Sequence, residues 1–198
     1  MTILAVPFHK QMSEFASGAA ALEMVVRYHH PSKLTKFSQS KIYNKLKQLA
    51  PHSGDTYRTT IDDLIKAADW RGFRTGWGRV SPIIPTMAQH VRYFIETARI
   101  PLIVCQRRTD QDFLFGHFRV VIGIEGDVIL HDPHPETGGA NLCWPLDKLD
   151  DYWRTTGANV SGGAAIWIGN TLISANPLSS DIPNLWADRE WFPRTPRT

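Results

Sequence analysis

Residues 116–133 read GHFRVVIGIEGDVILHDP, and this stretch does most to decide the predicted fold. Two apolar, β-branched runs, 118–124 and 128–130, lie on either side of Glu125-Gly126. Such runs around a short turn that contains glycine are typical of an antiparallel hairpin. The sequence therefore predicts two paired strands in this part of the chain.

The predicted hairpin brings a histidine and a carboxylate together. With Glu125-Gly126 as a two-residue turn, Asp132 lies opposite Arg119 and one diagonal away from His117 on the same face. Diagonal positions are roughly 7–8 Å apart at the backbone, within reach of an imidazole and a carboxylate, and such a pair can orient a catalytic base. A one-residue change in the turn would put the two on opposite faces. The alternatives are a satisfied histidine at a strand start and an Asp-Pro turn residue.

Outside the hairpin, the sequence predicts helices before Pro101 and strands after it. Apolar residues recur at helical spacing in the first hundred residues, and Ser38 and Thr59 or Thr60 are suitable helix caps. The expected helices are 17–29, 38–49, about 60–70, about 86–98 and 145–154, and the further strands are 102–105 and 164–168. Helices first and antiparallel strands second predict an α+β domain.

The bulk properties fit one globular domain. The 198 residues are 42% hydrophobic and 21% charged, and no apolar run is long enough to span a membrane. We expect a domain over residues 1–169, with a helical lobe to about residue 100 and a β lobe from 101, and an extended tail over 170–198. Trp186 and Trp191 in that tail can anchor it to the body or to a partner.

Charge and cysteine content narrow the class of protein. The net charge of +3 is small and spread along the chain, which argues against nucleic-acid binding. The N-terminus has no signal-peptide pattern. Two cysteines are too few for a disulfide scaffold and favour a reducing compartment, so we expect a cytoplasmic protein.

A nucleophile position stands at the start of the first long helix. Residues 11–22 read QMSEFASGAAAL, which places Ser17 where the helix begins. A side chain there gains from the helix dipole, and its own N–H can bind an oxyanion. Gln11 carries an amide that can serve as the second donor, and Gly18 leaves room for close approach. Read separately, Ser17 is a helix N-cap and Gln11 a surface polar residue.

These motifs together resemble the bacteriocin-processing (double-glycine leader) peptidases of the papain-like superfamily. The resemblance covers about residues 6–168 and is carried, in order, by Gln11, Ser17 to Leu22, Gly116 to Val121 and His131 to Pro133. It implies a papain-like fold in which a helical lobe with the nucleophile packs on a β lobe with the base. It also implies Gln11 as oxyanion donor, His117 as base and Asp132 as the residue that orients it, with a peptide or protein substrate in the cleft.

The sequence departs from that family at the nucleophile, where the family has cysteine and this chain has Ser17. A thiol can be ionised by a helix N-terminus and an imidazolium, whereas a hydroxyl needs its base during the reaction step. We therefore expect a cysteine peptidase made inactive or very weak, either because serine was introduced or because the native domain only binds peptide. A serine hydrolase is a third reading, but no Gly-x-Ser-x-Gly elbow surrounds Ser17.

The cysteines and the remaining histidines predict no further catalytic or metal site. Cys105 falls inside an apolar strand and is expected to be buried and inert, and Cys143 is expected in a loop or at a strand edge. The histidines at 29, 30, 131 and 134 have no recognised metal-ligand spacing, and no phosphate-binding glycine loop is present. We expect neither a metal nor a cofactor. Whether the reaction is hydrolysis or transfer to another amine stays open.

Overall fold

The computed structural model describes residues 2–31, 38–49, 59–69, 74–79, 84–111, 116–154 and 164–169. The helices are α1 (Ser17–His29), α2 (Gln39–Leu49), α3 (Ile61–Asp69), α4 (Ile84–Arg92), which continues as the π-helix η2 (Tyr93–Thr97), and α5 (Leu146–Arg154). The strands are β1 (Thr2–Ile3), β2 (Arg74–Arg79), β3 (Leu102–Arg107), β4 (Gly116–Glu125), β5 (Asp127–Asp132), β6 (Gly139–Trp144) and β7 (Ala164–Gly169). The expected tail lies outside the described residues.

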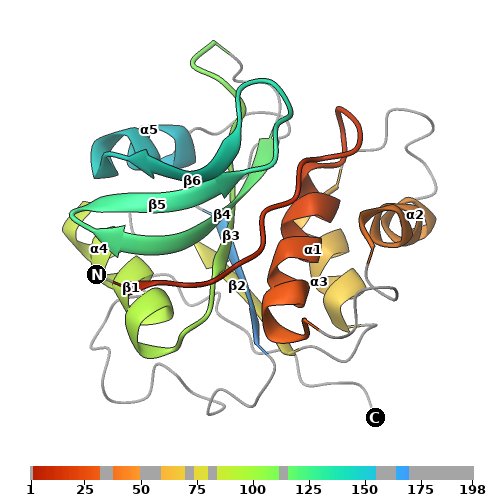
Figure 1. The fold of residues 1–198 in the computed structure, drawn as a ribbon, viewed down its shortest axis with the longest axis horizontal. Helices are drawn as coiled ribbons and strands as arrows, with labels where there is room; N and C mark the ends of the chain where they lie inside the picture. The colour runs from red at the N-terminus through yellow and green to blue at the C-terminus, as the bar shows by residue number, and fades with distance from the viewer. Residues whose placement is uncertain are drawn as a thin grey trace.

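The strands form one antiparallel sheet in the order β2-β7-β3-β4-β5-β6, with β1 paired to β4. Helices α1, α2 and α3 gather on one side of the molecule, and α4 and α5 accompany the sheet on the other (Figure 1). The predicted α+β fold is confirmed. None of the helices in the described ranges has the length and apolarity to cross a membrane.

Helix α1 is the central element and is buried along most of its length. Every residue from Ser17 to Val26 is buried, because α1 packs against β4 and β7 on one side and α2 and α3 on the other. Small residues allow this close packing. A Cβ built on Gly18 would lie only 2.8 Å from Cγ2 of Thr59. Gly18 is therefore needed for contact between α1 and the residues before α3, and the space beside it is already filled.

The expected helices are confirmed with small shifts at their ends. Thr60 caps α3, since its Oγ1 accepts the Asp63 N–H at 3.2 Å while the Asp63 carboxylate accepts the Thr60 N–H at 3.0 Å. This reciprocal pair is the capping-box arrangement, with aspartate as its carboxylate. Val91, Phe94 and Ile95 are buried, as their spacing predicted.

The predicted order of helices followed by strands is wrong in two places. β1 pairs with β4, and β2, which lies between α3 and α4, pairs with β7. β2 reads RTGWGR and lacks the apolar run that marks a strand, so its hydrogen bonds depend on a partner far away in the sequence. β6 was also missed, and Cys143, expected in a loop or at a strand edge, lies within it.

The turn between β4 and β5 is tighter than predicted. Glu125 pairs directly with Asp127, which leaves Gly126 alone between the strands. Gly126 has a φ of 88°, a left-handed conformation that glycine adopts without steric cost. The two-residue turn was therefore a wrong prediction, and by itself this change would move the histidine and the carboxylate to opposite faces.

A β-bulge corrects the register farther along the hairpin. The pairing shifts between Val121 and Gly123, so that β4 contains one extra residue. Beyond the shift Val120 pairs with His131, which is the register that a two-residue turn would have given. The histidine and the carboxylate consequently share a face after all.

Candidate active site

The sheet supplies a buried histidine–carboxylate pair. His117 is the second residue of β4 and Asp132 is the last residue of β5. His117 Nε2 lies 2.6 Å from Asp132 Oδ1, and each residue is 2% exposed. The predicted proximity of these two side chains is thus present in the structure.

Asp132 accepts hydrogen bonds from two further donors. Its Oδ2 accepts the Nε–H of Arg119 at 2.7 Å, and its Oδ1 accepts the backbone N–H of His134 at 2.9 Å. Burial by itself would raise the pKa of Asp132. The hydrogen bond of His117 and the charge that His117 gains at low pH, together with Arg119 and the His134 amide, outweigh burial and hold that pKa well below its usual range. Asp132 is therefore a carboxylate, with Arg119 as a partner that sequence analysis placed opposite it but gave no role.

His117 is neutral near pH 7. Burial, followed by the charge of Arg119, lowers its pKa to about 4, although the hydrogen bond and the charge of Asp132 act to raise it. A neutral imidazole beside a carboxylate donates from the nitrogen that faces it, so Nε2 carries the hydrogen. The other ring nitrogen, Nδ1, then holds the lone pair that a general base needs.

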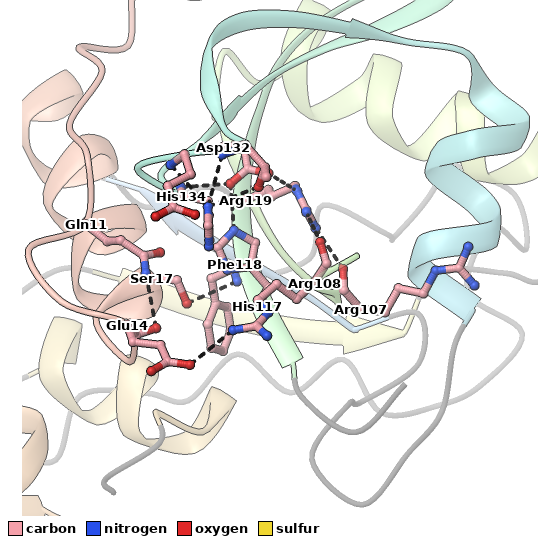
Figure 2. A network of polar contacts seen from close by, with 12 residues as sticks. Gln11, Glu14, Ser17, Arg107, Arg108, His117, Phe118, Arg119, Asp132 and His134 are labelled. Carbon is pink, nitrogen blue, oxygen red and sulfur yellow. Dashed lines mark hydrogen bonds and ion pairs between the residues drawn. The ribbon is translucent and has the colours of Figure 1, made fainter. Parts of the chain in front are cut away.

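Ser17 is the first residue of α1 and faces this strand. The helix N-cap is Ala16 and makes no side-chain capping bond, so the interpretation of Ser17 as an N-cap is wrong. Ser17 Oγ instead accepts the backbone N–H of Phe118 at 3.4 Å, a long contact to the residue next to His117. Ser17 is 7% exposed. Its hydroxyl thus lies beside the strand that carries the histidine (Figure 2).

Gln11 is held close to both halves of the site. Its backbone N–H donates to Pro133 O at 2.8 Å, directly after Asp132, and it is buried rather than a surface residue. Its side chain points toward Ser17 in Figure 2. However, Nε2 donates to Ser13 O at 2.9 Å and to Glu14 O at 3.1 Å, which occupies both amide hydrogens.

Gln39 of α2 positions the segment that carries Gln11, and sequence analysis missed it. Gln39 Oε1 accepts the Met12 N–H at 2.5 Å, and its Nε2 donates to Lys10 O at 2.9 Å. These bonds fix the backbone on either side of Gln11. In sequence, one glutamine in a polar helix gives no sign of this role.

The remaining candidates lie apart from this arrangement. Cys105 is buried in β3, as expected, and Cys143 is exposed with its Sγ 3.6 Å from Asp127. His131 bonds Val6 O through Nε2 at 2.9 Å and accepts the Asn141 N–H on Nδ1, so both ring nitrogens have structural partners. The described residues contain no cluster of metal-binding side chains.

Comparison with known proteins agrees with the fold. The peptidase domain of Streptococcus ComA, a bi-functional ABC transporter involved in quorum sensing, superposes with a TM-score of 0.56 at 18% identity, covering 82% of this chain and 97% of that one. A double glycine motif protease from an AMS/PCAT transporter, solved with its leader peptide, gives 0.51 at 20% identity, covering 84% and 93%. No curated protein matches. Residues 2–143 match the family described as papain-like cysteine protease AvrRpt2, and the chain therefore belongs to that family.

Proposed function

We propose that this protein is a papain-like peptidase domain, contained in residues 1–169, that binds a peptide substrate at residue 17, His117 and Asp132. One observation carries the proposal: the side chain of residue 17 contacts the backbone beside His117, whose ring is bonded to a buried carboxylate. A nucleophile, a base and a group that orients the base are the minimum for acyl transfer by a side chain.

In the proposed reaction the atom at the tip of residue 17 attacks a peptide carbonyl carbon. As the new bond forms, the proton of residue 17 moves to Nδ1 of His117, and the carbonyl π electrons move onto oxygen. The N–H of residue 17 stabilises that oxyanion. When the intermediate collapses, the amine leaves with the proton from His117, and the acyl group stays on residue 17. Water or a second amine then takes the acyl group.

Gln11 joins this scheme as the second oxyanion donor only after a rearrangement. Both of its amide hydrogens are bonded to carbonyls of its own loop, so at least one of these bonds must be exchanged for the bond to the oxyanion. A substrate that shifts residues 13–14 would release them. We therefore propose Gln11 as a donor that is recruited by the bound peptide.

Serine at residue 17 is expected to slow the first step severely. A hydroxyl has no accessible anion near pH 7, whereas a cysteine thiol has one within reach. We infer that the Ser17 chain holds peptide and cleaves it weakly or not at all. A binding module without catalysis is the second candidate, favoured by the serine itself.

A peptide whose leader sequence ends in two glycines and is followed by further residues is the probe that separates these functions, because cleavage after the second glycine must release an amine. Such a peptide is chosen because one similar structure was solved with a leader peptide. We expect the Ser17 chain to bind it without cleavage and Ser17→Cys to cleave it, with His117→Ala in the Ser17→Cys background abolishing cleavage. Binding by both forms with cleavage by neither supports the binding module. Labelling of the Ser17 chain by a serine-directed phosphonate supports a serine hydrolase. The absence of peptide binding, of cleavage by Ser17→Cys and of phosphonate labelling contradicts the proposal.

A further inference from the structure

Arg119 is a buried cation whose guanidinium is fixed on all sides. The residue is 2% exposed, and its Nε donates to Asp132. Its two terminal nitrogens donate to the carbonyl oxygens of Arg107 at 3.0 Å and Arg108 at 2.8 Å (Figure 2). All three guanidinium nitrogens are therefore bonded within the protein, and the charge cannot move away from the site.

Two aromatic rings complete the surroundings of this cation. The guanidinium carbon of Arg119 lies 4.9 Å from the ring centre of Trp144 in β6 and 5.4 Å from that of Tyr152 in α5. Aromatic faces attract a cation without supplying a negative charge that neutralises it. Among the described residues, Asp132 is the only carboxylate that forms an ion pair with Arg119.

Asp132 is thus shared between the neutral imidazole of His117 and the cation of Arg119. Its Oδ1 serves His117 and its Oδ2 serves Arg119, at 2.6 and 2.7 Å. The Arg119–Asp132 pair already sums to zero charge, so protonation of His117 would add an uncompensated positive charge in a buried site. Without Arg119, the same protonation would form a neutral imidazolium–carboxylate pair.

The other groups around His117 do not supply the missing negative charge. His134, after β5, lies with its ring centre 6.0 Å away, and its charge would also oppose protonation. Ser17 faces the site from α1, and on β3 the residue paired with His117 is the neutral Gln106. Burial acts in the same direction as Arg119.

We propose that Arg119 is a positioning residue that keeps His117 neutral in the resting site by holding the second oxygen of Asp132. Residue 17 is then not ionised in advance and loses its proton to His117 only as it attacks. This proposal rests on the proposed function for its chemical meaning, but the charge state of His117 can be measured without any reaction.

The experiment is an NMR titration of the His117 ring nitrogens in the Ser17 chain and three variants. Arg119→Gln removes the charge, Arg119→Lys keeps it, and the pair Arg119→Gln with Asp132→Asn removes both charges together. We expect the His117 midpoint to lie below its ordinary value of about 6.5 in the parent. It should rise by about one pH unit or more in Arg119→Gln and stay low in the other two.

Several results would overturn the proposal. A parent His117 that is protonated at pH 7 contradicts it without any variant, which matters if Arg119→Gln fails to fold. A midpoint in Arg119→Gln equal to that of the parent, or a rise in Arg119→Lys as large as in Arg119→Gln, also contradicts it. Failure of Ser17→Cys to cleave the leader peptide would instead reject the proposed function and leave this titration result intact.

Discussion

The two sides of the candidate site differ in how completely their polar groups are bonded. On the sheet side Asp132 accepts three hydrogen bonds of 2.6–2.9 Å, and the partners His117 and Arg119 are as buried as the carboxylate. On the helix side Ser17 makes a 3.4 Å contact, and the Gln11 amide is bonded to its own loop with a buried Oε1 that has no partner among the described residues.

This difference separates the side that carries the proposed base from the side that carries the proposed nucleophile. His117, the proposed base, and Asp132, the proposed orienting group, lie in a hydrogen-bond network with Arg119 that does not include residue 17. The proposed nucleophile position holds serine, and the amide hydrogens of Gln11, the proposed oxyanion donor, are already bonded. Changes on the sheet side should therefore affect folding strongly, while changes on the helix side should affect chemistry with smaller costs in stability.

The largest effect on stability is expected from Asp132→Asn. It leaves the buried Arg119 charge without a counter-ion, which costs about 3–5 kcal/mol in the free energy of unfolding. Urea denaturation at pH 7 measures this loss. Asp127→Asn, on the same strand but exposed, is the matched control and should change stability by less than about 0.5 kcal/mol. Equal losses of stability for Asp132→Asn and Asp127→Asn would contradict the greater effect on folding that is expected of the sheet side.

Acid should destabilise the protein through the sheet side. The pKa of His117 is about 4 in the folded chain and about 6.5 when unfolded, so the unfolded chain binds more protons between these values. The contribution of neutral His117 to the free energy of unfolding is on the order of 3 kcal/mol. It is fully present above about pH 6.5 and is lost as the pH falls toward 4.

The check is unfolding free energy against pH for the parent and His117→Gln. His29 and His131 also have lowered pKa values and add to the same slope, so the variant should flatten the profile without abolishing it. Identical slopes for the parent and the variant would show that folding does not lower the pKa of His117.

On the helix side, Gly18→Ala should destabilise by about 1–3 kcal/mol because its Cβ would meet Thr59. The same change at an open helix position is stabilising. Thermal unfolding shows directly whether Gly18→Ala raises or lowers stability. Adding Thr59→Ala removes the contact at 2.8 Å but not the Cβ at 2.9 Å, so it should recover part of the loss. A gain in stability from Gly18→Ala alone would mean that α1 has room to move.

The smallest effect is expected from Gln11→Ala. Two bonds to the loop carbonyls are lost, but a buried oxygen without a partner is removed as well, so the net cost is about 1 kcal/mol. Met12→Ala, at an exposed neighbour, controls for the loss of side-chain bulk. A cost of several kcal/mol would mean that Gln11 is mainly structural.

How much of the fold and of the candidate site could be predicted from the sequence depends on whether neighbouring residues determine each feature. The bounds of α1 and the cap of α3 follow from neighbouring residues; the bounds were predicted, and the cap was predicted as Thr59 or Thr60. β6 was missed although its partner β5 directly precedes it, because its sequence GANLCW contains no long continuous apolar run. β2 was missed because it pairs with β7, which is distant in the sequence. The roles of Arg119 and Gln39 were missed for the same reason.

The hairpin shows a different kind of outcome. The predicted pairing of histidine and carboxylate is present, although the turn that was to produce it is one residue tighter. A bulge between Val121 and Gly123 compensates. Gly123 stands at this shift, and an isolated glycine in a strand is a typical sign of a bulge, but the sequence was not interpreted in that way.

The most direct test of the central claim is the alkylation rate of residue 17 in Ser17→Cys, with and without His117→Ala. Cys143, which is exposed and remote from His117 along the sheet, serves as the internal reference in the same chain. If the imidazole serves the side chain at residue 17, His117→Ala will slow labelling there by about 100-fold or more and leave Cys143 unchanged. An unchanged ratio between the two cysteines would mean that residue 17 and His117 do not act together.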